Sequence, residues 1–65
     1  MIDIGKLTLA DVGRAVVYSP RGGGRREDGE ISSWNERYVF VRYRGGFTAS
    51  TSPEDLDFLS AMVRP

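Results

Sequence analysis

The chain has 65 residues, of which 40% are hydrophobic and 28% are charged, a composition typical of a globular domain. Lysine plus arginine equals aspartate plus glutamate at nine each, which disfavours non-specific nucleic-acid binders, because phosphate neutralisation supplies most of their affinity. The absence of cysteine and histidine excludes disulfides and leaves carboxylates as metal ligands, so we expect one small domain over residues 1–65, stabilised by an apolar core or by association.

The first 19 residues predict a turn followed by a strand. LADVG, residues 9–13, is expected to form one helical turn that stops at Gly13, where a positive φ angle is tolerated. RAVVYS, residues 14–19, is β-branched and aromatic and predicts a strand in which Val16 and Tyr18 share one face. Three other apolar residues are expected to cover one end of the core: Leu7, Leu9 and Val12.

PRGGGRREDG, residues 20–29, predicts a long mobile loop, because it contains four glycines and five charges and no apolar side chain except the proline ring. Its glycines do not match a phosphate-binding loop, which needs a lysine and a hydroxyl before a helix. The loop is expected either to be a flexible hairpin connection or to become ordered when it meets a partner.

The next 22 residues predict two hairpins. EISSW is expected to be a strand with Ile31 and Ser33 inward, and a tight turn at Asn35 and Glu36 follows, since asparagine tolerates left-handed backbone. RYVFVRY is the strongest strand signal in the chain, and a Gly-Gly turn leads into FTAST. The expected strands are therefore residues 30–34, 37–43 and 47–51.

SPEDLDFLSAMV, residues 52–63, predicts a short C-terminal helix. Ser52 fits the N-cap and Pro53 the first helical position. Leu56, Leu59 and Val63 form an apolar stripe at helical spacing. The expected fold is mainly β: a small, closed or half-closed barrel of four to five antiparallel strands with this helix at its end.

The succession VGRAVVY, glycine-rich loop, GEISSWNERYVFVRY, GG and TSPEDL resembles the SH3-like barrels of the Tudor and KOW type. The matching positions are Gly13, Val16, Tyr18, Gly29, Ile31, Val39, Val41, Tyr43 and Leu56. More loosely, SWN-x-RYVFVRY and TSPEDL resemble short proteins of tailed phages and prophages. The resemblance implies the barrel fold, and it implies a phage or prophage accessory protein in the host cytoplasm.

The strand of residues 37–43 offers the main candidate binding face. Its period of two places Val39, Val41 and Tyr43 on the core side and leaves rings alternating with arginines on the other. That second side is either covered by the chain ends or exposed, where it would stack bases or hold an extended peptide. The candidate partner-binding residues are Trp34, Tyr38, Phe40, Arg42, Arg44, Arg25 and Arg26.

Trp34 has two interpretations. It either packs at the end of a hairpin or belongs to a ring cage for a methylated cation, which the Tudor resemblance implies. The rings of such a cage would be Tyr18, Trp34 and either Tyr38 or Tyr43.

The sequence indicates a binding or assembly module rather than an enzyme. Without histidine or cysteine the usual bases and nucleophiles are absent, and we expect no cofactor, metal site or small-molecule substrate. The expected partner is a protein, including a second copy of the chain, and the alternative is nucleic acid, which the KOW resemblance implies. No apolar run approaches the roughly 20 residues of a membrane span, so a cytoplasmic protein is expected.

Overall fold

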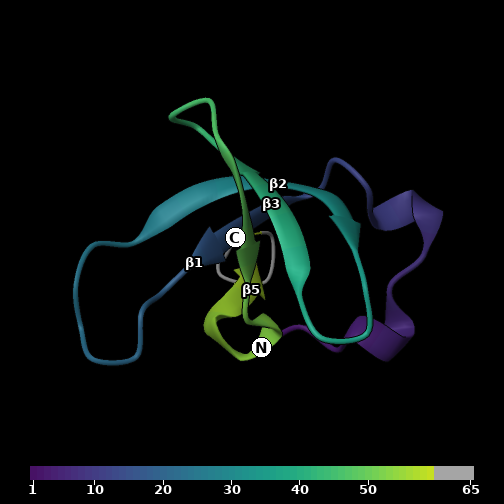
Figure 1. Cartoon of the computed structure of the whole chain (residues 1–65), viewed down its shortest axis with the longest axis horizontal. Coiled ribbons are helices and arrows are strands. Elements are labelled where there is room, and N and C mark those ends of the chain that lie inside the picture. Colours follow the sequence, from purple (N-terminus) through teal and green to yellow (C-terminus); the bar gives the residue numbers. More distant parts are fainter. Residues whose placement is uncertain (60–65) are drawn as a thin grey trace, which may run out of the picture.

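The computed structural model describes residues 1–59, which form one antiparallel sheet of five strands (Figure 1). The strands are β1 (Ala15–Tyr18), β2 (Glu27–Trp34), β3 (Val39–Tyr43), β4 (Thr48–Thr51) and β5 (Leu56–Phe58). Short 3-10 turns lie outside the sheet: η1 (Ile4–Lys6), η2 (Leu9–Asp11) and η3 (Pro53–Asp55). The predicted mainly β class with four to five antiparallel strands is confirmed.

The sheet is curled around one core without forming a closed barrel. Its strand order is β4-β3-β2-β1-β5, and the edge strands β4 and β5 do not pair with each other within residues 1–59. Side chains from β1, β2, β3 and β5 nevertheless meet in a single cluster, which a flat sheet of this order would keep apart. The buried members are Ile2, Val16, Ile31, Val39, Val41, Tyr43 and Leu56.

The N-terminal segment covers part of this core. Ile2 is 2% exposed, and its backbone N–H donates to the carbonyl oxygen of Pro53 at 3.0 Å. Leu7 packs against the core as predicted. The prediction is wrong for Leu9 and Val12, which are 87% and 47% exposed, because the η2 turn projects away from the sheet (Figure 1). Gly13, which follows η2, does have a positive φ of 90°.

Strand β2 is longer than the sequence indicates and takes the end of the predicted loop. It begins at Glu27, because Glu27, Asp28 and Gly29 pair with Tyr18, Val17 and Val16 of β1. The connecting loop is therefore residues 19–26. Charges and a glycine favoured a loop in the sequence, but in this part of β2 the charges lie at the surface and the glycine packs closely against β3.

The register of β2 against β3 shifts between Ile31 and Ser33. As a result Ser33 lies opposite Phe40, and Trp34 lies opposite Val39. The predicted inward position of Ser33 is wrong, because this irregularity turns Trp34 toward the core instead.

The two β hairpins of the C-terminal half use different turn chemistry. Asn35 does not adopt left-handed backbone, since the residues with positive φ in the described chain are glycines. Its side-chain Oδ1 instead accepts from the backbone N–H groups of Arg37 and Tyr38, both at 2.8 Å. In the next hairpin Gly46 has a φ of 90°, as expected for the Gly-Gly turn.

The predicted C-terminal helix is wrong as far as residue 58. Ser52 and Pro53 do begin a helical turn, but η3 ends at Asp55 and the chain continues as strand β5. Leu56 and Phe58 face the core because β5 pairs with β1, in which Tyr18 and Val16 are their partners. Residues 60–63 of the expected helix lie outside the described residues.

Candidate binding site

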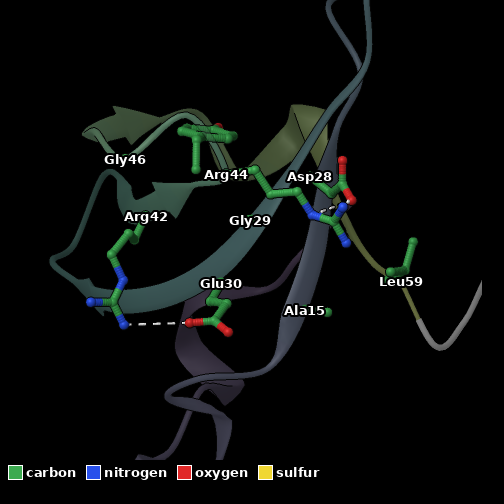
Figure 2. A pocket seen from close by; sticks show the side chains of 9 residues that line it. Ala15, Asp28, Gly29, Glu30, Arg42, Arg44, Gly46 and Leu59 are labelled. Carbon is green, nitrogen blue, oxygen red and sulfur yellow. Dashed lines mark hydrogen bonds and ion pairs between the residues drawn. The ribbon is translucent and has the colours of Figure 1, made fainter.

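The outer face of β2 and β3, which points away from the core, carries cross-strand ion pairs (Figure 2). Arg42 Nη2 lies 3.4 Å from Glu30 Oε1, and Arg44 Nε lies 3.3 Å from Asp28 Oδ2. The register explains the first pair, since Glu30 is directly opposite Arg42. Exposed pairs of this kind contribute at most about 1 kcal/mol each. Their main consequence here is that the arginines are neutralised at short range.

A hollow of about 290 Å³ lies beside these pairs, with Ala15 and Leu59 as apolar parts of its lining. Figure 2 shows Arg42 and Arg44 reaching to opposite sides of Gly29 toward their carboxylates. Because those guanidinium groups already have carboxylate partners, the hollow offers little unpaired charge to a phosphate or an acidic ligand.

The predicted site residues do not form one surface. Phe40, half-buried, shares the outer face with Arg42 and Arg44. Trp34 packs against the core on the opposite face, which agrees with its structural interpretation, and Tyr38 lies in the turn after β2 and is 44% exposed. The remaining candidates lie at the other end of β2, exposed on the loop between β1 and β2: Arg25 and Arg26.

The cage that the Tudor resemblance implied is not formed by the expected rings. Trp34 is paired with Val39 at one end of the β2–β3 hairpin, whereas Tyr43 is paired with Gly29 near the other end. Val39 and Tyr43 are four residue steps apart along β3, which is about 13 Å in an extended strand. Trp34 and Tyr43 therefore cannot surround the same small cation.

Three rings, two of them expected for the cage, gather at the end of the sheet that includes the β3–β4 turn. The rings of Tyr43 and Phe47 are stacked with centroids 5.3 Å apart, and the ring of Tyr18 meets Tyr43 edge-on at 6.4 Å. They border a hollow of about 330 Å³ that is also lined by Ala49 and Thr51 of β4. We call this hollow the ring pocket. Phe47 is 49% exposed, so its ring is accessible at the rim.

The inner part of the ring pocket is held by a buried hydrogen bond. The hydroxyl groups of Tyr43 and Thr51 are 2.7 Å apart. Burial raises the pKa of Tyr43, the Thr51 hydrogen bond opposes this effect, and the nearby carboxylate of Glu27 adds to it. The phenol is therefore neutral over the physiological range and fixed in orientation, which makes Tyr43 a rigid platform for the Phe47 ring.

The charged residues that line the ring pocket are both acidic: Glu27 and Asp55. Asp55 Oδ1 forms an ion pair with Arg21 Nε at 3.3 Å, and Arg21 also pairs with Glu54. These contacts hold the β1–β2 loop against η3. Glu27 has no ion-pair partner among the described residues. The pocket consequently combines aromatic faces with one unneutralised carboxylate.

The ring pocket was not recognised in the sequence because it depends on register. Tyr43 was assigned to the core face of its strand, Tyr18 to the same strand face as Val16, and Phe47 only to a strand. They meet because Gly29 pairs with both Val16 and Tyr43, which brings the ends of β1 and β3 to the same part of β2. The signal that could have revealed it is the Tyr43-to-Phe47 spacing across a Gly-Gly turn, which places two rings on one hairpin end.

No protein-family model, curated protein or solved structure matches the chain. Within residues 1–59 no three carboxylates gather closely enough to hold a metal ion. The same residues include no helix of sufficient length and apolar character to span a membrane.

Proposed function

We propose that the chain is a non-enzymatic binding module for a protein partner and that the ring pocket holds that partner. The observation that carries this proposal is the position of Phe47, a half-exposed ring stacked on the buried Tyr43 at the rim of a hollow. Aromatic side chains in such positions give large contact areas at low entropic cost, because their neighbours already fix their orientation.

The proposal includes kinship with SH3-like barrels and a phage accessory role in the host cytoplasm. The kinship with SH3-like barrels is supported by five short antiparallel strands and by Leu56, which follows the η3 turn as the resemblance expects, and the phage role follows from the sequence resemblance. The unpaired edges of β4 and β5 within residues 1–59 are a departure from a closed barrel, and the ring pocket is lined in part by β4, one of these two edge strands.

Nucleic acid is the second candidate, and the exposed arginines of the β1–β2 loop favour it. Arg25 and Arg26 make no ion pair with the described residues, and the loop carries glycines with φ of 87° and 121° at Gly23 and Gly24. Against it, Arg42 and Arg44 are paired with carboxylates. Titration with mixed-sequence single-stranded RNA or DNA tests this function. If it is correct, the affinity for the nucleic acid should fall steeply between low and moderate salt concentration.

The protein-binding proposal is tested by selecting ligands from a random peptide library displayed on phage, with the full chain as bait. We expect the recovered peptides to share a residue pattern and to lose about tenfold or more of their affinity for Phe47→Ala, as for central aromatic contacts. Tyr38→Ala is the matched control, since Tyr38 is a comparably exposed ring far from the pocket. Peptides that lose affinity for Tyr38→Ala and not for Phe47→Ala would refute the assignment of the site.

A further inference from the structure

Within residues 1–59 the outer edge of β4 has no pairing strand. β4 is the first strand in the sheet order, with β3 as its neighbour. Tyr43 N–H donates to Phe47 O at 2.8 Å, and alternation along an antiparallel pair then places Ala49 in a hydrogen-bonded pair with Val41. The N–H and C=O groups of Thr48 and Ser50 accordingly point away from β3, where a further strand could bind them.

The β4 edge carries none of the charges, prolines or bulges by which proteins often block such pairing. Exposed edges commonly carry charged residues, prolines or bulges. The sequence of β4 is TAST, and its pairing with β3 is regular over all four residues. The edge is therefore short, uncharged and open to an added strand.

The same strand borders the ring pocket on its inner face. Ala49 and Thr51 line the pocket, and side chains of directly paired residues lie on the same face of a sheet. In an added strand, the residues opposite Ala49 or Thr51 would direct their side chains to the pocket side. The residues opposite Thr48 and Ser50 would point to the outer face.

The chemistry of the pocket selects the inward side chain. Its aromatic faces attract a cation through their negative electrostatic potential. Both charged lining residues are carboxylates, and Glu27 has no cationic partner among the residues described. A lysine or arginine side chain would satisfy Glu27 and lie against Phe47, whereas an acidic side chain would be repelled.

We infer that an extended segment of a protein partner adds to the sheet along β4, antiparallel to it, and places a lysine or arginine side chain in the ring pocket. This inference rests on the proposed function and specifies its ligand. Backbone hydrogen bonds to Thr48 and Ser50 supply one part of the affinity, and the cation supplies the other.

The test uses the synthetic peptide acetyl-Thr-Val-Arg-Val-Thr-amide and the isotope-labelled full chain, observed by NMR. With the arginine inward, the N–H groups of the two valines face β4 and that of the arginine faces away. We expect resonance shifts at Phe47, Thr48 and Ser50 at millimolar peptide. Methylating the backbone nitrogens of both valines should weaken peptide binding at least about tenfold, because two hydrogen bonds to β4 are lost. Methylating the backbone nitrogen of the arginine is the matched control and should leave peptide binding nearly unchanged, because that N–H group faces away from β4.

The cation is tested separately. Replacing the arginine of the peptide by citrulline, its neutral analogue, should weaken binding by about 3- to 10-fold. Glu27→Gln should weaken the arginine peptide about 2- to 5-fold and leave the citrulline peptide unaffected. Equal binding of the arginine and citrulline peptides would overturn the assignment of the cation.

Absence of shifts at millimolar peptide, shifts confined to the outer face, or equal binding of the two methylated peptides would overturn the added strand. A concentration-dependent oligomer that broadens the β4 resonances without peptide would show that a second copy occupies the edge, and it would also overturn the inference. Failure here is distinguishable from failure of the proposed function, because library peptides sensitive to Phe47→Ala would still establish the ring pocket as a protein-binding site.

Discussion

Among the glycines of the described chain, Gly29 has the least room for a side chain. It lies in β2 between Val16 of β1 and Tyr43 of β3. A Cβ atom at this position would lie 2.5 Å from the carbonyl oxygen of Arg42 and 2.8 Å from Val41 Cγ1. Backbone cannot rotate out of the way as a side chain can, so we expect Gly29→Ala to lower the free energy of unfolding by about 1–3 kcal/mol.

This prediction is checked by urea denaturation followed by the fluorescence of Trp34. Gly22→Ala is the matched control, since a Cβ there meets no atom within 4 Å and the φ angle of Gly22 is not positive. We expect the control to change stability by at most about 0.5 kcal/mol. A Gly29→Ala protein as stable as the control would mean that β2 and β3 are not packed in the described register.

Asn35 holds the turn between β2 and β3 through its side chain. Its Oδ1 accepts from the N–H groups of Arg37 and Tyr38, so Asn35→Ala removes the acceptor of both. Each hydrogen bond contributes roughly 0.5–1.5 kcal/mol, and water replaces part of this contribution at the exposed site. We therefore expect Asn35→Ala to lower the free energy of unfolding, measured by urea denaturation, by about 1–2 kcal/mol. Asn35→Asp keeps the acceptor and should retain most of the stability; equal losses for the two variants would contradict this role.

At the scale of elements, alternation of apolar residues was the reliable signal in the sequence. Val39, Val41 and Tyr43 alternate, and β3 buries all three as predicted. The C-terminal segment was ambiguous, because Leu56 and Leu59 fit a helical stripe while Leu56 and Phe58 fit a strand. Pairing with β1 decided in favour of the strand, and such pairing between segments about 40 residues apart is not visible in local propensity.

The candidate site was predictable only in part, for the same reason. Tyr43 was correctly placed on the core face, but the approach of Tyr18 to Tyr43 depends on where β2 begins. Reading residues 27–29 as loop removed the part of β2 that pairs with Val16, Val17 and Tyr18 of β1. The expected binding face grouped Trp34 with residues that lie on the other side of the sheet, because the register shift between Ile31 and Ser33 was not visible in the sequence.

The η2 turn gives a prediction for acid stability. The pKa of Asp11 lies below its usual value of 3.8, first because its carboxylate accepts from the Thr8 backbone N–H at 2.9 Å and then because it pairs with Arg14. The folded state therefore binds the proton more weakly than the unfolded state. The resulting stabilisation is fully present above the unfolded pKa and disappears as pH falls through the lower, folded value.

We expect the wild-type chain to lose more stability than Asp11→Asn when the pH is lowered from about 5 to about 2. Asparagine carries no charge to titrate, and the other carboxylates contribute equally to both proteins. Urea midpoints across this range provide the measurement. Parallel pH profiles for the two proteins would show that the η2 contacts do not persist in solution.

At the scale of the whole molecule, the open sheet depends on segments outside it to complete the core. The edge strands β4 and β5 do not join in the described chain, and the N-terminal segment passes beside η3 and inserts Ile2 among residues of the core cluster. Domains of this size bury only about 60% of the surface that the unfolded chain exposes. One well-buried side chain is therefore a large part of the total stabilisation.

Ile2→Ala should be among the most destabilising substitutions, although the residue is second in the chain. Removing a buried isoleucine side chain costs about 2–5 kcal/mol, against a total of about 5–15 kcal/mol for a typical domain. Leu9→Ala is the control, because Leu9 is 87% exposed and should change stability by less than about 0.5 kcal/mol. Equal midpoint temperatures of thermal unfolding for the two variants would mean that the N-terminal segment is not packed on the core. Residues 1–7 would then contribute nothing to the closure of the sheet.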